Sequence, residues 1–197
     1  PFFHQTYIEP NVATARVEPD GRITIWTACQ GIFNIRDSVA GALKMPHGRI
    51  RVIGTKIGGG FGAKNGVFVE SHAALLSIRT GRPVQVVMDR EEEFRDGKPA
   101  PGCVTRLKLG ANSDGTLTAI EGRIVWDGGW TGGGGAPNRL KGPYRFPNVR
   151  LAGYAVRTNK PSPGAYRAPG SPQTAFAVES TMDLLARKLG MDPLELR

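Results

Sequence analysis

The chain has 197 residues, of which 40% are apolar, and 26 basic against 17 acidic side chains give it a formal net charge of +9. This length can bury a core within one domain or two small lobes. No apolar stretch comes near the roughly 20 residues that span a bilayer, and Cys29 and Cys103 stand in no metal-binding or disulfide spacing. We therefore expect a globular protein of a reducing compartment, the cytoplasm, with no membrane partner.

The positive charge is scattered along the chain rather than gathered into a stripe with interleaved aromatic residues. Residues 89–93 also place four acids around one arginine. This pattern argues against nucleic acid as a partner, and it favours either a solvated basic surface or a surface that meets acidic partner subunits.

The first half of the chain predicts alternating strands and helices. Asp20 and Gly21 form a turn before a β-rich run. A glycine-rich loop, residues 58–62, separates a strand-like run from an amphipathic stretch. We expect strands at 23–27, 50–57 and 84–88, and helices at 35–43 and 65–79.

The second half predicts a similar series. Asp114 and Gly115 precede another β-rich run. The stretch from Gly128 to Gly135 is too rich in glycine for a regular element, so we expect a mobile lid or a loop ordered by a ligand or partner. We expect strands at 104–109, 117–126 and 149–156, and a helix at 173–189.

Both ends of the chain suggest a piece of a larger protein. The first residue is Pro1 rather than methionine. Asp192 and Pro193 are typical of the N-cap and first position of a helix, for which only residues 194–197 are left. We therefore expect the remainder of the polypeptide to hold part of the active site.

One helical pattern occurs twice. The pattern E-S-x-x-x-L-L-x-x-x-x-G runs from Glu70 to Gly81 and recurs residue for residue from Glu179 to Gly190. Each copy predicts an amphipathic helix that ends at a C′ glycine. Together with the two Asp-Gly turns, the pattern indicates an internal duplication. We expect an α+β fold in which residues 1–197 form one lobe, built from repeats at about 1–95 and 96–197.

The loop Gly58-Gly59-Gly60-Phe61-Gly62-Ala63-Lys64 is the strongest local feature. Its glycines allow positive φ and let backbone N–H groups approach an anion. The dipole of the following helix would add to that attraction. The loop is not of the Walker A type, because Lys64 precedes Asn65 rather than serine or threonine.

Two other interpretations of this loop remain open. Gly58, Gly60 and Ala63 satisfy G-x-G-x-x-G/A, and the next predicted strand ends at Asp89. A Rossmann-like domain that binds NAD or FAD is therefore the alternative function. A glycine-rich turn with no ligand is the other possibility.

The second repeat carries a proline-rich loop, residues 163–173, at the corresponding place. Its Arg167 suits one anionic group held in a fixed orientation, or it pairs with a nearby carboxylate. Gln30, at the end of the first strand run, can donate to a ligand oxygen or satisfy loop backbone groups. The isolated histidines are not expected to bind a metal, and we expect Glu70 and Glu179 to bind loop N–H groups rather than act in catalysis.

Short motifs along essentially the whole chain resemble those of one known family. They are His4-x-x-x-x-Glu9-Pro10, Asp20-Gly21, Gln30, Arg51-Val52, Gly58-Gly59-Gly60-Phe61-Gly62-x-Lys64, Gly81-Arg82-Pro83-Val84, Gly142-Pro143-Tyr144, Pro147-Asn148-Val149, Thr158-Asn159, Gly164-Ala165-Tyr166-Arg167, Pro172-Gln173 and Asp192-Pro193. This set resembles the molybdopterin-binding subunit of the xanthine dehydrogenase/aldehyde oxidase family. That family's cofactor domain consists of repeated α+β units in two lobes, and this chain resembles the first lobe.

The resemblance implies a molybdenum hydroxylase, in which a pterin dithiolene holds the molybdenum and an aldehyde or N-heterocycle is oxidised with oxygen from water. By position, Gln30 would hydrogen-bond the oxo side of the metal centre. Phe61 would present its backbone N–H beside it, while Gly60 and Gly62 permit the close approach. Arg167 and its loop would flank the metal. No side chain of this chain is expected to ligate the metal directly, and the cytosine dinucleotide is one candidate form of the pterin.

Three departures from the family pattern shape these expectations. The family's catalytic glutamate lies in the second lobe, so we expect no catalytic residue in this chain and no activity from it alone. At two substrate-pocket positions, Asn65 and Pro169 stand where purine enzymes carry an acidic and an aromatic residue, which disfavours purines. No cysteine pattern for an iron-sulfur cluster and no flavin segment is present, so those cofactors are expected on other domains or subunits.

Overall fold

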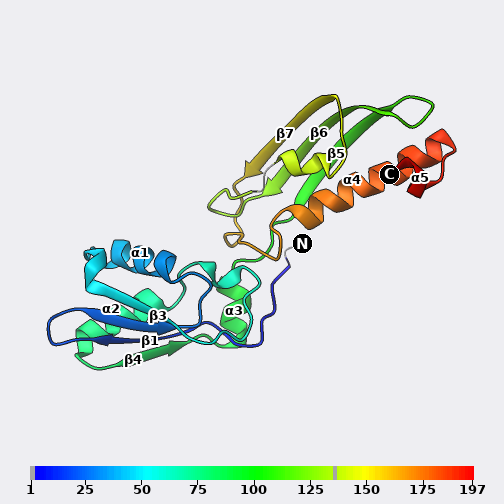
Figure 1. Cartoon of the computed structure of the whole chain (residues 1–197). Coiled ribbons are helices and arrows are strands. Elements are labelled where there is room, and N and C mark those ends of the chain that lie inside the picture. Colours follow the sequence, from blue (N-terminus) through cyan, green and yellow to red (C-terminus); the bar gives the residue numbers. More distant parts are fainter. Residues whose placement is uncertain (1–2, 135–136) are drawn as a thin grey trace. The chain divides into compact units, whose positions relative to one another are not determined.

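The computed structural model describes residues 3–134 and 137–197 (Figure 1). It divides into two compact units. The first unit consists of His4–Pro99 and the short segment Ala165–Arg167, and the second of Phe3, Ala100–Gly164 and Ala168–Arg197. Gly135, in the glycine-rich stretch noted above, lies outside the described residues. Each unit combines a β-sheet with helices, so the predicted α+β class is confirmed.

The first unit is a four-stranded sheet with the order β3-β2-β1-β4. β1 is antiparallel to β2 and to β4, whereas β2 and β3 are parallel. The strands are β1 (Val12–Val17), β2 (Ile23–Thr27), β3 (Ile50–Gly54) and β4 (Val84–Val87). The helices are α1 (Ile32–Leu43), α2 (Glu70–Thr80) and α3 (Arg90–Asp96), with short 3-10 turns η1 (His47–Arg49) and η2 (Ala63–Asn65).

The core of the first unit lies between this sheet and the helices α1 and α2. Alternate residues of the strands, such as Ala15 on β1 and Ile25 on β2, are fully buried. They pack in one cluster with Ile35 and Val39 of α1 and Ala73 of α2. The apolar face that alternate strand residues form on the sheet therefore packs against the apolar stripe of each helix.

The second unit is a three-stranded sheet with the order β5-β6-β7, in which β5 and β6 are antiparallel and β6 and β7 parallel. α4 lies along one face of it, and Val178, Met182 and Ala186 pack there against Leu107 and Leu109 (Figure 1). The elements are β5 (Cys103–Ala111), β6 (Leu117–Asp127), η3 (Pro137–Lys141), β7 (Asn148–Val156), α4 (Ser171–Leu189) and α5 (Pro193–Leu196).

Two elements were not expected from the sequence, and one helix is shorter than expected. β1 and α3 have no counterpart among the predictions. The helix expected at 65–79 begins only at Glu70, because Gly66 is extended, with φ −116° and ψ 173°. The strand expected at 50–57 ends at Gly54. The connection between β3 and α2 is therefore longer than the sequence suggests.

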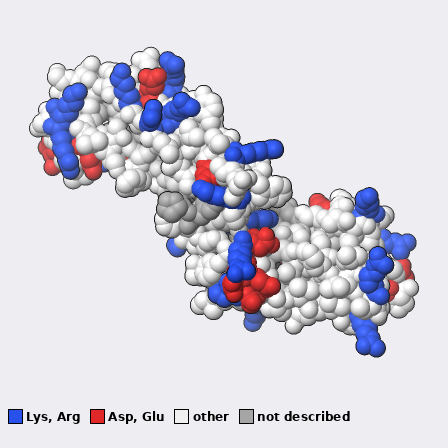
Figure 2. Space-filling model, turned by 180° about the vertical axis from the view of Figure 1, so that it is seen from behind, with Lys and Arg blue, Asp and Glu red and all other residues white. Residues whose placement is uncertain are grey.

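Charge on the visible face is distributed over separate places. Figure 2 shows basic side chains in several small groups, many of them beside acidic ones. Within the described ranges, no helix combines the length and apolarity that crossing a bilayer requires.

Candidate functional site

The glycine loop, Gly58–Lys64, has an unusual backbone. Gly62 has φ 100°, and Phe61 has φ 51° although it carries a side chain. A positive φ in a residue other than glycine costs about 1 kcal/mol or more relative to an ordinary backbone conformation. The other candidate loop has the same property, with φ 29° at Arg167 and 59° at Ala168. Strain of this kind gathers at ligand sites, because binding geometry is retained at the expense of local stability.

Gln30 is fixed against the glycine loop. Its side-chain carbonyl Oε1 accepts the Gly62 N–H at 2.9 Å, and its backbone N–H donates to the Lys64 carbonyl at 2.9 Å. A Cβ at Gly60 would lie 2.6 Å from Gln30 Oε1, so only glycine allows this approach. The carbonyl end is thus used within the protein, and the amide nitrogen has no acceptor among the residues that the structure describes.

The segment Ala165–Arg167 lies against the same loop. A Cβ at Gly62 would come within 2.6 Å of the Ala165 carbonyl oxygen. The Arg167 N–H donates to the Phe61 carbonyl at 2.9 Å, and Gln5 Nε2 donates to the Ala165 carbonyl at 2.8 Å. Five of the seven predicted site residues, Gln30, Gly60, Phe61, Gly62 and Arg167, therefore meet in the first unit.

Several donors in this place are unused. The backbone N–H groups of Gly60 and Phe61 have no acceptor in the described part of the chain, and the exposed Arg167 guanidinium has no carboxylate partner there. The alternative in which Arg167 pairs with a nearby carboxylate therefore has no support within the described ranges. Donors arranged in this way fit a ligand that presents oxygen acceptors or negative charge.

The expected helix dipole does not contribute here. α2 begins at Glu70, six residues beyond Lys64, and the intervening η2 is a single 3-10 turn. The loop therefore presents its own N–H groups rather than a helix N-terminus.

Lys64 is buried beneath the loop, with 1% of its surface exposed. Its Nζ lies 2.7 Å from Glu9 Oε2, and that same oxygen accepts the Gly58 N–H at 2.8 Å. Burial alone would raise the pKa of Glu9, but the hydrogen bonds from Lys64 and Gly58 lower it below its ordinary value. The sequence alone does not predict this pair, because no spacing rule relates residues so far apart in the chain.

The two predicted substrate-pocket residues fall in different units. Asn65 is exposed at the end of η2 in the first unit. Pro169 belongs to the second unit, where its carbonyl accepts a hydrogen bond from Arg139 Nη1 at 2.7 Å. Their role toward a substrate stays a prediction.

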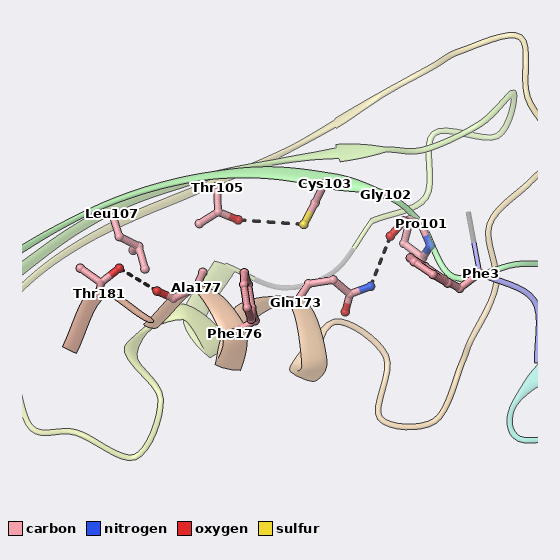
Figure 3. Close-up of a pocket in the computed structure, with 10 residues that line it drawn as sticks. All are labelled: Phe3, Pro101, Gly102, Cys103, Thr105, Leu107, Gln173, Phe176, Ala177 and Thr181. Atoms are coloured by element: carbon pink, nitrogen blue, oxygen red, sulfur yellow. Dashed lines mark hydrogen bonds between the residues drawn. The ribbon is translucent and has the colours of Figure 1, made fainter. Parts of the chain in front are cut away.

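A pocket of about 430 Å³ lies in the second unit between β5 and α4 (Figure 3). Gln173 donates from Nε2 to the Pro101 carbonyl at 3.2 Å along one side, and Cys103 and Thr105 line the sheet side. None of the predicted site residues lines it. The hollow is therefore distinct in composition from the donor cluster around the glycine loop, and it lacks charged groups.

Metal ligands of the usual kind are not gathered anywhere in residues 3–134 and 137–197, where no three His, Cys, Asp or Glu side chains are placed to hold an ion. The donor cluster instead offers N–H groups. It therefore fits a ligand that exposes oxygen atoms.

The Rossmann-like alternative is not supported. In that fold the strand after the glycine loop and helix lies parallel beside the first. Here the strand after α2 is β4, which pairs antiparallel with β1 at the opposite edge of the sheet from β3. Asp89 caps α3, where its carboxylate accepts the Glu92 N–H at 2.8 Å, rather than facing a ribose.

Comparison with known proteins assigns the chain to a family. All of it, residues 1–197, matches the family model of the molybdopterin cofactor-binding domain. It is 36% identical to the nicotinate dehydrogenase large molybdopterin subunit of Eubacterium barkeri, over 97% of this chain and 46% of that protein. It is also 36% identical to the xanthine dehydrogenase molybdenum-binding subunit of Escherichia coli, over 100% of this chain and 27% of that one.

A solved structure agrees with these relatives. The aldehyde oxidoreductase of Desulfovibrio gigas superposes with a TM-score of 0.91 and 32% identity, covering 99% of this chain and 22% of that one. The chain thus spans less than half the length of these oxidoreductases. The resemblance found in the sequence motifs is confirmed, and the chain belongs to the molybdopterin cofactor-binding domain family.

Proposed function

We propose that the donor cluster around the glycine loop binds the molybdenum-molybdopterin cofactor, and that the complete protein is a hydroxylase that oxidises an aldehyde or N-heterocycle with oxygen from water. One observation carries the proposal. Gln30 and the Phe61 backbone, which are 31 positions apart, meet the Arg167 backbone at the same strained loop, and the donors they leave unused point to an oxygen-rich ligand.

Each residue has a definite role in this proposal. The bound cofactor supplies the metal that takes up electrons from the substrate. The Gln30 side-chain amide and the Phe61 N–H donate hydrogen bonds to its oxygen atoms, and Gly60 keeps the approach open. Arg167 adds positive charge without a competing carboxylate in the described chain. Donors fixed before the ligand arrives stabilise developing negative charge without reorganisation.

The proposal assigns the remaining parts of the reaction to other segments. No side chain here is assigned a catalytic role, so we propose that the catalytic glutamate belongs to the rest of the subunit and that this segment alone is inactive. Electrons would leave through iron-sulfur clusters and FAD on further domains or subunits. The cytosine dinucleotide remains the candidate form of the pterin.

The substrate class rests on the two predicted pocket residues. Asn65 and Pro169 provide neither the negative charge nor the aromatic face that a purine would meet in the enzymes this chain resembles. We therefore propose an aldehyde or an N-heterocycle other than a purine. Of the relatives named above, the nicotinate dehydrogenase and the aldehyde oxidoreductase agree with this range of substrates, whereas the xanthine dehydrogenase is named for a purine.

Molybdenum and pterin content of the complete polypeptide tests the proposal. In Gly60→Ala, the new Cβ would lie 2.6 Å from Gln30 Oε1, so we expect the variant to lose most of its cofactor. Gly48→Ala is the matched control, because nothing lies within 4 Å of its new Cβ. Wild-type protein without molybdenum and pterin, from a host that loads the relatives, would refute the proposed function.

A further inference from the structure

We infer that the ion pair between Glu9 and Lys64 positions the glycine loop, with Lys64 acting as a positioning residue for the donors above it. A lysine is almost never fully buried unless its charge is paired. Lys64 is 1% exposed, its Nζ lies 2.7 Å from Glu9 Oε2, and it lies 5.0 Å from the centre of the Tyr7 ring. Burial removes water from the Lys64 ammonium group, which costs free energy. An apolar side chain could fill the same space without that cost.

The pair closes the loop at its base. Glu9 Oε2 binds both ends of the loop, through the Gly58 N–H at 2.8 Å and Lys64 Nζ at 2.7 Å. The Glu9 N–H also donates to the Gly58 carbonyl at 3.3 Å. A Cβ at Gly58 would lie 2.6 Å from Glu9 Cβ, so the two segments are in contact. One carboxylate oxygen therefore sets the distance between the first and last residues of the loop.

Hydrogen bonds link Lys64, at the base of the loop, to the donor residues. The Lys64 carbonyl accepts the Gln30 N–H at 2.9 Å, and Gln30 Oε1 in turn accepts the Gly62 N–H at 2.9 Å. A displaced Lys64 therefore moves Gln30 and the turn at Gly62 together. Four of the seven loop residues are glycines, which have no side chains to hold the turn by packing.

The other end of the pair is anchored to α3. Residues on either side of Glu9 bind the buried Glu93, since the Tyr7 hydroxyl and the Asn11 N–H both donate to its carboxylate. Asn11 Nδ2 adds a third hydrogen bond at 3.1 Å. Glu93 is 3% exposed. Glu9 is thus held in a segment with its own support, and it can restrain the loop rather than follow it.

Hydrogen exchange of the loop peptide in the complete protein, without reference to cofactor, tests this inference. We expect Lys64→Met to raise exchange at residues 58–64 about tenfold or more, because the loop opens locally once the pair is broken. Val39→Ala is the control, since it removes a buried side chain of α1 that takes no part in the loop contacts. Equal exchange in Lys64→Met and wild type would overturn the inference.

A double variant separates positioning from general stability. Glu9→Gln alone leaves the buried Lys64 charge unpaired, whereas Glu9→Gln with Lys64→Met removes both charges, so we expect the melting temperature of the double variant to recover relative to Glu9→Gln alone. Loop exchange should stay fast in the double variant, because the link between the two ends of the loop is still missing. Loop protection that returns together with the melting temperature would show that the pair is only structural, and would overturn the inference.

The consequence for the cofactor rests on the proposed function, but the exchange measurement does not. If that function holds, Lys64→Met should retain less pterin than Val39→Ala at equal melting temperature. Molybdenum-free wild-type protein would refute the proposed function while leaving the exchange result unchanged, so the two failures are distinguishable.

Discussion

The two units share a framework and differ in the loop that leaves their third strand. In each, two antiparallel strands are followed by a crossover to a parallel third strand, and a later helix packs on the sheet. In the first unit the third strand leads into the glycine loop, closed by Glu9 and Lys64. In the second unit the third strand leads into the proline-rich loop, residues 163–173, of which Ala165–Arg167 belong to the first unit. The same arrangement of strands and helix therefore carries a glycine-rich loop in one unit and a proline-rich loop in the other.

We propose that this shared framework reflects the internal duplication predicted from the sequence, with repeats at residues 1–95 and 96–197. What supports it is the matching order of strand pairs and the recurrence of the Glu-Ser pattern on α2 and α4. The proposal predicts equivalent positions in the two helices, so differences between those positions are informative.

The two equivalent glutamates have different partners. Glu70 is 3% exposed and accepts hydrogen bonds from Thr27 Oγ1 at 2.8 Å and the Phe68 N–H at 2.9 Å. Glu179, with a side chain 41% exposed, instead accepts the Tyr144 hydroxyl at 2.8 Å and pairs with the final residue of the chain. The expectation that both bind loop N–H groups holds for Glu70 and is wrong for Glu179.

The largest expected effect on stability comes from replacing the buried one of these two glutamates. Glu70→Ala leaves the Thr27 hydroxyl and the Phe68 N–H without their carboxylate partner in a buried place, and we expect a loss of about 3 kcal/mol in the free energy of unfolding. Glu179→Ala should cost about 1 kcal/mol or less, because its partners reach water. Urea unfolding of both variants measures the difference, and a larger loss in Glu179→Ala would contradict the assignment.

A smaller effect is expected where the Ala165–Arg167 segment meets the glycine loop. Gly62→Ala introduces a Cβ 2.6 Å from the Ala165 carbonyl oxygen, in addition to the strain of a φ of 100°. Gly81→Ala, in the C-cap of α2, has the strain of a φ of 65° but nothing within 4 Å of the new Cβ.

We expect Gly81→Ala to lose about 1 kcal/mol, and Gly62→Ala to lose about 2 kcal/mol or more because the clash adds to the strain. Hydrogen exchange at residues 165–167 should rise only in Gly62→Ala. Equal stability and equal exchange in the two variants would mean that the segment does not depend on the loop.

Sequence reasoning succeeded where a signal is local. The Asp-Gly turn and β-branched residues gave the strand at 23–27 with its observed bounds. β1 escaped notice because Ala13 and Ala15, both fully buried, have little strand propensity of their own. Their small size suits a close approach by α2, which only the tertiary structure displays. The run of acidic residues at 89–93 conceals α3 in the sequence, although the spacing of Asp89 and Glu92 is that of a capping box.

The candidate site divides in the same way. Glycine spacing located the loop at residues 58–64, and the family resemblance supplied Gln30 and Arg167. The Glu9–Lys64 pair joins residues 55 positions apart, and the contact between Phe61 and Arg167 joins residues 106 positions apart. No periodicity or turn signal encodes such contacts, because they depend on how the sheet and its loops come together.

The smallest expected change in stability concerns two arginines, Arg167 in the proline-rich loop and Arg139, which binds that loop. Arg139 Nη1 donates to the Pro169 carbonyl at 2.7 Å and to Ser171 Oγ at 2.6 Å, whereas the Arg167 guanidinium has no partner in the described ranges. Arg139→Ala should therefore lose about 1 kcal/mol, and Arg167→Ala should stay within about 0.5 kcal/mol of wild type. If Arg167 serves an anionic ligand, its removal should lower pterin content in the complete protein while leaving the unfolding curve in place. A destabilised Arg167→Ala with full cofactor content would show instead that the side chain supports the fold, because a residue kept for binding has its effect only when the ligand is present.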